Sequence, residues 1–292
     1  MREALASLTV LLLFAGMPIA ARADWTLAAS AALKHDSNVG NAQESYDKVR
    51  DYTASADLSL FRLIPLGGNF TLELGGSLSG EAYDKLDGLN NASVDGIASI
   101  KRKWGLGAFA PWTRAQFSVG RTNYKDDYRN ATIYRAALEF GKRIDERWSL
   151  WGGYSFERRA ATPGPELLPG LSSDAFSQDG NNLTATGEFL LSERISLTAG
   201  TLWRHGDVVS TTLSPGYYLF SSSDAVAQDP AFGPDAYAYR LTGTTYGVKL
   251  GAEFSVTAHS VIGCGYQWLE THARGGNNYS DSMPEVTWHY RF

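Results

Sequence analysis

Residues 70–82 read Phe-Thr-Leu-Glu-Leu-Gly-Gly-Ser-Leu-Ser-Gly-Glu-Ala, which is the clearest alternating pattern in the chain. From Phe70 to Ala82, every second position carries an apolar or small residue. The positions between them, from Thr71 to Glu81, carry only Thr, Glu, Ser and Gly. Successive side chains of a β-strand point to opposite faces, so the pattern predicts a strand with one apolar and one polar surface.

The same alternation continues along the chain. Residues 52–60 alternate in this way, and so do residues 148–157. Further alternating segments cover residues 183–191 and 262–268, and the chain ends with another at residues 286–292. We count about twelve such segments, each close to the ~10 residues that a tilted strand needs to cross a bilayer.

The connections between the expected strands alternate in length. The short ones lie near Pro65–Asn69, Gly105–Pro111, Ile144–Arg147, Ser192–Arg194 and Thr257–Ser260. The long ones lie near Ser37–Arg50, Asp84–Asn91, Lys125–Ala131, Ala160–Asn181, Gly206–Ala236 and His272–Ser282. An up-and-down barrel with short periplasmic turns and long outer loops has this asymmetry, whereas a soluble sandwich mixes lengths at both ends. The sequence therefore predicts an all-β, transmembrane, antiparallel up-and-down barrel with both termini on the periplasmic side.

One expected strand changes its phase. Tyr237 and Leu241 share one parity, whereas Tyr246 and Val248 share the other. Two explanations remain open for this change. Either a bulge near Gly243–Thr245 shifts the alternation, or the first part of the strand projects beyond the membrane.

The polar face carries too many charges for a dry core. We therefore expect the apolar face to meet lipid and the polar face to line a lumen, with aromatic residues near the strand ends at the membrane interfaces. The charged residues expected to line the lumen are Asp57, Glu73, Asp95, Lys101, Arg114, Arg135, Glu139, Arg143, Glu157, Arg159, Glu188 and Arg204. Both signs are well represented, so we expect no strong single-sign field. These charges form either a structural network of ion pairs or a selectivity lining.

The composition and the N-terminus restrict the class of protein. The 292 residues carry a formal net charge of −5 and a single Cys, which argues against a nucleic-acid binder and excludes an internal disulfide framework. Residues 1–23 have the pattern of a secretory signal peptide: Arg2, then the apolar run Leu8–Ala15, then Ala21-Arg22-Ala23 before the expected cleavage site. We therefore expect residues 24–292 to form one barrel domain.

The C-terminus carries a resemblance to a known class. The chain closes on Val286-x-Trp288-x-Tyr290-x-Phe292, which resembles the signal that the barrel-assembly machinery reads in bacterial outer-membrane β-barrels. The stretch His35–Val39 resembles the first-strand exit of porin-like proteins and of the barrel domain of surface-lipoprotein assembly modifiers. The periplasmic helical-repeat domain of those modifiers has no expected counterpart here. The resemblance implies the outer membrane of a Gram-negative bacterium, with outer-membrane lipid, lipopolysaccharide and the assembly machinery as partners.

His35 and Ser37 suggest an enzymatic alternative. The stretch from His35 to Asn38 resembles a His-x-Ser-Asn segment of outer-membrane phospholipases and lipid A deacylases. Residues two apart on a strand share a face, so this His and Ser could act as base and nucleophile. The other interpretation is a polar strand exit at the level of the lipid headgroups.

Our leading hypothesis is an outer-membrane channel or export conduit for a small polar solute. The alternatives are the lipid-modifying hydrolase and a structural or adhesive barrel that acts through its outer loops. The two longest loops have a length that is typical of functional or disordered segments, and we expect Tyr217–Phe220 in one of them to form either a lid or an exposed contact surface. The scattered His residues and the lone Cys264 indicate no metal site, and the sequence implies no cofactor.

Overall fold

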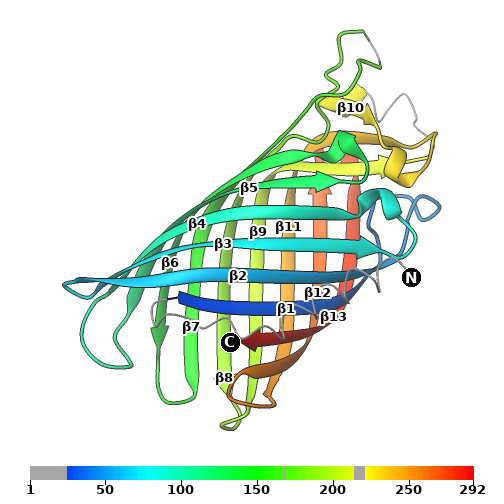
Figure 1. Ribbon diagram of the computed structural model, residues 1–292. Coiled ribbons are helices and arrows are strands. Elements are labelled where there is room, and N and C mark those ends of the chain that lie inside the picture. The colour runs from blue at the N-terminus through cyan, green and yellow to red at the C-terminus, as the bar shows by residue number, and fades with distance from the viewer. Residues whose placement is uncertain (1–24, 168, 214–220) are drawn as a thin grey trace.

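Antiparallel β-strands make up most of the protein in the computed structural model, which describes residues 25–167, 169–213 and 221–292 (Figure 1). The expected signal peptide and Tyr217–Phe220 lie outside the described residues. The strands are β1 (Trp25–Asp36), β2 (Asp51–Gly67), β3 (Phe70–Tyr83), β4 (Asn91–Lys103), β5 (Trp112–Tyr124), β6 (Ala131–Arg143), β7 (Trp148–Ala161), β8 (Gln178–Leu190), β9 (Ile195–Thr212), β10 (Ala225–Gln228), β11 (Tyr237–Ser255), β12 (Ser260–Ala273) and β13 (Asn278–Arg291). Four short 3₁₀ helices are η1 (Asp87–Leu89), η2 (Asp127–Arg129), η3 (Pro230–Phe232) and η4 (Arg274–Gly276).

All strands except β10 close into one barrel of twelve. Each wall strand pairs antiparallel with the next along the chain, with β9 pairing directly to β11. The ring closes where β1 pairs with β13, from Ala28 opposite Arg291 to Lys34 opposite Glu285. Closure gives every wall strand two neighbours, so no row of unpaired backbone groups faces lipid. The predicted twelve-stranded antiparallel barrel is confirmed.

Large apolar side chains cover the outside of the wall. Leu78, Leu138 and Leu250 on three different strands are 58%, 60% and 52% exposed. Water around such a belt would be unfavourable, and hydrocarbon around it removes that cost. Among the described residues, no helix is long and apolar enough to cross a membrane. The apolar face of the strands is therefore the surface that suits a bilayer.

The longest connections, after β1, β7 and β9, all lie at one end of the barrel, as the sequence predicts. The turn after β4, between Lys103 and Trp112, is longer than expected and exceeds the links after β3 and β5. The last loop is different. β12 continues to Ala273 and β13 begins at Asn278, so only four residues connect the strands where a long loop was expected at His272–Ser282. Polar residues at these strand ends pair across the sheet, as Thr271 does with Tyr279. The polar composition of this segment is typical of a loop, although the backbone hydrogen bonds between β12 and β13 continue through it.

The phase change in β11 has a clear structural basis. Its register with β9 runs without a shift from Tyr237 opposite Thr212 to Phe254 opposite Ile195, so there is no bulge. Instead, both strands extend past their other neighbours: β9 leaves β8 at Gly206, and β11 leaves β12 at Gly243. Beyond these points, β10 takes over as the second partner of β11. The first part of β11 thus projects beyond the rest of the wall.

A capped lumen as the candidate functional site

The segment between the wall portions of β9 and β11 forms a cap over the long-loop end of the barrel. We use "cap" for the described residues among 207–242, which include β10 and η3. In ring order, β9 and β11 stand six places from β3 and β4, which is the opposite wall in a ring of twelve. Yet η3 packs against η1, which lies in the link between β3 and β4. The two helices are so close that a Cβ added to Gly88 of η1 would lie 2.7 Å from the Cα of Ala231 in η3. The cap therefore crosses the mouth of the barrel, and Figure 1 shows both segments at this end.

A buried ion pair fastens the cap to the link between β5 and β6. Arg129 donates from Nε to Asp229 Oδ1 at 3.0 Å and from Nη2 to Asp229 Oδ2 at 2.6 Å. Asp229 is fully buried, and it also accepts from Thr211 Oγ1 at 2.6 Å. Burial alone would lower the pKa of the Arg129 guanidinium, but the Asp229 carboxylate raises it overall. Two parallel hydrogen bonds therefore join the two side chains, and we call this bidentate pair the latch.

A second carboxylate lies beside the latch. Asp126 accepts backbone N–H groups from Tyr128 and, across the interface, from Ala231, each at 3.3 Å. Burial raises the pKa of Asp126, and the nearby charge of Asp229 raises it further. The N–H of Tyr128 and the Arg129 cation partly offset this rise. This part of the latch is therefore sensitive to protonation.

The loop between β1 and β2 holds the cap from another side. Asp47 accepts from Thr212 Oγ1 at 2.6 Å and from the Leu213 N–H at 3.2 Å. The Thr211 N–H donates to the Gly40 carbonyl at 2.7 Å. A Cβ on Gly40 would lie only 3.1 Å from the ring of Phe232, so the glycine permits this close approach. The loops after β1, β3 and β5 thus all contact the cap.

Apolar side chains form the interior of the cap in three clusters. One contains Phe176 and Ala238, the second contains Tyr239 and Leu241, and the third joins Leu89 and its neighbours in the far wall to η3. The buried apolar residues among those described are Ala42, Leu86, Leu89, Ala131, Ala175, Phe176, Val208, Ala225, Val226, Ala227, Ala231, Ala236, Ala238, Tyr239, Leu241, Ala273 and Tyr279. All of them lie at the long-loop end. The hydrophobic core among the described residues therefore lies in the cap and in the loops and strand ends that pack against it.

The register places all twelve charged residues from the sequence analysis on one face of the wall, opposite to the face that carries Leu78, Leu138 and Leu250. Two cross-strand ion pairs stand out among them. Arg114 lies opposite Glu139 and contacts it at 2.6 Å, and Arg135 lies opposite Glu157 and contacts it at 2.6 Å. Asp95 reaches Arg135 at 4.0 Å. These groups fit the structural alternative, a network that pairs charges along the wall.

Other cations of that set are held by backbone carbonyls. Arg143 donates to the carbonyls of Asp145 and Glu146, at 3.1 and 2.6 Å, and so braces a short turn. Arg204 donates to the Asp207 carbonyl at 2.7 Å, where β9 enters the cap. Both guanidinium groups therefore stabilise local backbone.

The remaining charged residues of the set have varied surroundings. Arg159 donates to the carbonyl of Arg129, so it supports the latch. Lys101 Nζ lies 4.4 Å from the centre of the Trp112 ring. Glu73 shares a cavity of about 550 Å³ with Lys101 near the short turns, and Glu188 lies opposite Ser149 in β7.

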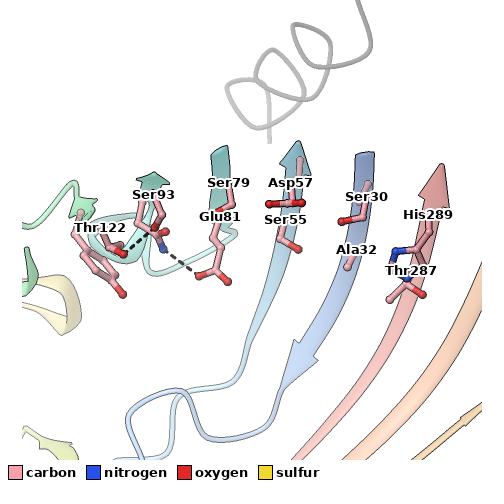
Figure 2. Close-up of a pocket in the computed structure, with 15 residues that line it drawn as sticks. Ser30, Ala32, Ser55, Asp57, Ser79, Glu81, Ser93, Thr122, Thr287 and His289 are labelled. Carbon is pink, nitrogen blue, oxygen red and sulfur yellow. Dashed lines mark hydrogen bonds between the residues drawn. The ribbon is translucent and has the colours of Figure 1, made fainter. Parts of the chain in front are cut away.

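A different part of the inner face is lined mainly by hydroxyl groups, and we call it the hydroxyl wall (Figure 2). The cross-strand register arranges it in two neighbouring rows over six strands, around a cavity of about 340 Å³. The first row consists of His289, Ser30, Asp57, Ser79, Ser93 and Thr122. The second row consists of Thr287, Ala32, Ser55, Glu81, Asn91 and Tyr124.

Few of the polar side chains on the hydroxyl wall form hydrogen bonds with one another. Ser93 donates to Thr122 at 2.8 Å, and the Asn91 amide donates to Glu81 at 3.0 Å, as the dashed lines in Figure 2 show. Within the described part of the chain, the carboxylate of Asp57 has no hydrogen-bond or ion-pair partner. The hydroxyl wall therefore presents donors and acceptors to the lumen.

The structure does not assemble the expected base–nucleophile pair. The Ser37 hydroxyl donates to Asp281 at 2.7 Å, and the His35 ring packs against the Tyr52 ring with centroids 4.8 Å apart. Within residues 25–167, 169–213 and 221–292, no hydrogen bond joins His35 to Ser37, and no group of three or more His, Cys, Asp or Glu residues could hold a metal ion. The arrangement fits a polar strand exit.

The C-terminal aromatic residues form a ladder of ring contacts. The ring centroids of Trp288 and Tyr290 are 5.9 Å apart, and those of Tyr290 and Phe292 are 4.8 Å apart. The Phe292 N–H donates to the Leu27 carbonyl at 3.0 Å, so the last residue still belongs to the closing seam. The role of these three residues as an assembly signal stays a prediction.

Comparison with solved structures identifies the architecture. The crystal structure of an outer-membrane channel from Pseudomonas putida F1 superimposes with a TM-score of 0.60 at 12% identity, covering 93% of this chain and 97% of that one. This chain has the outer-membrane β-barrel fold. The translocator domain of the autotransporter NalP from Neisseria meningitidis is similar to this barrel with a TM-score of 0.47 and 14% identity over 100% of this chain and 96% of the other. No family model and no curated protein matches the barrel sequence.

Several residues of the site were not singled out from the sequence. Arg129 and Asp229 are 100 positions apart, and neither sits in a motif that predicts a partner. The hydroxyl wall did leave a signal, because Ser30, Ser55 and Ser79 all occupy polar positions of alternating segments. That signal shows which face each serine occupies, but the rows require the register between strands.

Proposed function

We propose that this protein is a channel of the Gram-negative outer membrane for small polar solutes, with its extracellular mouth covered by the cap. The observation that carries the proposal is the combination of a closed ring, an apolar outside and a charged, hydroxyl-bearing inside with cavities of about 340 and 550 Å³. Similarity to an outer-membrane channel agrees with it at the level of fold. A barrel interior of this polarity suits a hydrated solute.

The distribution of charge supports a polar solute without a strong preference for anions or cations in the lumen as a whole. Arg114 and Arg135 are neutralised by carboxylates on the neighbouring strand. Lys249 on β11 is neutralised by Glu285 on β13, two strands away, at 2.8 Å. Neutralised pairs leave a weak net field, so hydrogen bonding contributes more to selectivity than long-range attraction does.

The cap implies that conduction requires a movement. Asp229 and Leu241 are both 0% exposed, so the closed cap is packed as tightly as a protein core. A solute that enters from outside would have to pass where η3 meets η1. We therefore expect a low conductance with the cap closed and a higher one when it is displaced.

Planar-bilayer recording of the purified protein tests this proposal. The wild type is compared with a variant in which residues 213–236 are replaced by a short Gly/Ser turn, which leaves the wall portions of β9 and β11 intact. We expect rare conductance steps in KCl for the wild type and larger, longer steps for the variant. Circular dichroism and resistance of the barrel to unfolding in detergent confirm that both are folded. Absence of conductance in both folded proteins would refute the channel.

The same preparations address the alternative functions. Release of fatty acid from phospholipid or lipid A vesicles, lost in Ser37→Ala, would support a hydrolase in place of the channel. Cell-surface binding that is lost on loop deletion while permeability is unchanged would support adhesion instead. The geometry of His35 and Ser37 does not favour the hydrolase, because each side chain contacts a different partner.

A further inference from the structure

We propose that the hydroxyl wall is a binding site for a small hydroxylated cation, of which an amino sugar is the simplest representative. This inference rests on the proposed channel function and names the class of solute that the lumen favours. It depends on three properties of the wall: the spacing of its hydroxyl groups, its unneutralised carboxylates, and the absence of Lys and Arg from its lining among the described residues.

The spacing suits a ring that carries several hydroxyl groups. Along the first row, Ser30, Asp57, Ser79 and Ser93 lie directly opposite one another on successive strands. Side chains in that relation stand about 5 Å apart, which is comparable with the width of one sugar ring. Each hydroxyl can donate and accept, so two rows can satisfy a solute whose own hydroxyl groups need both partners.

The carboxylates give the wall a local negative charge. Asp57 has no hydrogen-bond or ion-pair partner in the described chain, and Glu81 accepts only from the neutral amide of Asn91. The lining includes His289 at one end of a row but no Lys or Arg. The rows on either side hold one cation each: Lys34, which is close to Asp36 at 3.9 Å, and Arg291, whose guanidinium lies 5.8 Å from the centre of the Phe61 ring. A cation entering the wall therefore meets two carboxylates that lack a cationic partner.

The regions of the inner face around Arg114, Arg135 and Lys249 provide the contrast, whereas Glu188 and Glu253 elsewhere on that face also have no ion-pair partner among the described residues. Arg114, Arg135 and Lys249 each contact a carboxylate at 2.6 to 2.8 Å, so those regions are neutralised from within the protein. A solute cation could not compete there without breaking a pair. At the hydroxyl wall it would supply the missing charge. Unpaired carboxylates would repel an anion, and an apolar solute would leave the hydroxyl groups without partners.

The proposed site is open to the lumen, and such a site suits transport. Burial of a ligand on all sides would slow its release, whereas conduction requires binding weak enough to allow exit. Side chains on one wall can make weak contacts with one face of a sugar while water solvates the other face. The site is therefore expected to select solutes during passage without retaining them.

Solute flux into proteoliposomes tests the inference, using the variant with residues 213–236 shortened so that cap opening does not limit the rate. The probes are glucosamine, glucose and glucuronate, which share a ring and differ in charge. We expect glucosamine to enter fastest and glucuronate slowest. The double variant Asp57→Asn/Glu81→Gln should lose this order, with the glucosamine rate falling about fivefold, because two local charges have been removed. The matched control Glu188→Gln removes an inward carboxylate outside the hydroxyl wall and should leave the order unchanged.

A second double variant separates hydroxyl recognition from simple attraction of cations. Ser55→Ala/Ser79→Ala keeps both carboxylates and removes two hydroxyl groups. It should slow glucosamine and leave the flux of tetramethylammonium, a cation without hydroxyl groups, unchanged. Equal reduction for both cations, or no reduction for glucosamine, would overturn the assignment of a hydroxylated solute.

The outcomes distinguish this inference from the channel proposal. If KCl conductance is present but the three sugars enter at equal rates, the site assignment fails and the channel stands. The site assignment also fails if the Asp57→Asn/Glu81→Gln variant keeps the order of sugar fluxes seen in the cap-shortened protein. If the folded, cap-shortened protein conducts neither KCl nor any sugar, the channel proposal itself fails.

Discussion

The wall and the cap use the same two strands in opposite ways. In the wall portion of β11, Tyr246 and Leu250 point outwards and are 50% and 52% exposed. In the cap portion of the same strand, Tyr239 and Leu241 occupy the other parity and are 2% and 0% exposed. The strand pairs with β9 without a register shift, so its backbone pairing is the same in both portions. What changes is the medium that each face meets.

This difference explains the distribution of apolar residues over the whole chain. A membrane wall needs apolar groups outside, because lipid covers them, and polar groups inside. The cap is surrounded by water and must bury its apolar groups within itself, as soluble domains do. A change of apolar parity within a continuous strand therefore marks the point where a barrel strand leaves the membrane. Four predictions test this contrast.

The largest effect is expected from the latch. Asp229→Asn removes one partner of a buried pair and leaves the Arg129 guanidinium without its counter-charge, which costs about 4 kcal/mol. If this energy acts on cap closure, the ratio of open to closed channels rises by up to roughly a thousandfold. The open probability in single-channel recordings measures this ratio. The control is Asp224→Asn, which breaks the exposed contact with Arg274 at 2.6 Å and should have little effect. Equal open probabilities in the two variants would contradict the latch.

The next prediction compares two leucines of β11. Leu241→Ala creates a cavity in the cap and should cost about 3 kcal/mol of local stability. Leu250→Ala shortens a side chain that faces lipid, so the cap should keep its wild-type stability. Hydrogen exchange of the amides at 225–242 reports on the cap, and unfolding of the whole barrel in urea reports on the wall. We expect only the first variant to speed exchange. Faster exchange in both would show that cap and wall are not energetically separate.

A third prediction tests which face of the wall meets lipid. Leu138→Arg places a cation on the outer face near the middle of β6 and should lower the free energy of unfolding in vesicles by about 2 kcal/mol. Ala137→Arg, one residue earlier on the inner face, should cost less because water and the nearby Glu139 can solvate it. Urea titration in lipid vesicles compares them. The reverse order would assign the apolar face to the inside.

The smallest effect concerns pH. Burial raises the pKa of Asp126 in the closed cap, whereas an open cap exposes it to water and leaves it near the ordinary value of about 4. The closed state therefore binds this proton more tightly, so Asp126 favours closure as pH falls towards its raised pKa and stops doing so as pH rises through it. The contribution stays below about tenfold in open probability.

Comparison of open probability between pH 7 and about 5 in the wild type and Asp126→Asn isolates this contribution. The N–H groups of Tyr128 and Ala231 donate to different oxygens of Asp126, so the single amide oxygen can accept from one of them, and the amide cannot titrate. We expect a smaller pH response in the variant than in the wild type. An identical response in both would assign the dependence to other groups.

The wall could be predicted from the sequence because its determinants are local. Alternation in residues 70–82 is enough to identify a strand and its two faces, and repetition gives the number of strands. The exception lies between β12 and β13, where the polar residues near Thr271 resembled a loop. Beyond the bilayer both faces of a strand can be polar, so alternation disappears although the pairing continues.

The candidate site could be predicted only in part. Parity identified Asp57 as an inner-face residue, but its lack of a partner and the rows of hydroxyl groups depend on the register of six strands. Arg114 and Glu139 were expected as lumen charges, and their pairing again follows from register. The cap was beyond reach because Arg129 and Asp229 meet only through the closed ring.

The path of the cap across the mouth also fixes an order of assembly. Its contacts come from the loops after β1, β3, β5 and β7 and from the link after β12, and Asp47 meets Thr212 across 165 positions of sequence. These docking points are brought together only when the strands have curved into a ring, since loops on opposite walls of an open sheet are far apart. The cap is therefore the last element to form. Its protection from protease should appear only in molecules whose β1 and β13 have already joined, which makes it an internal marker of a completed barrel.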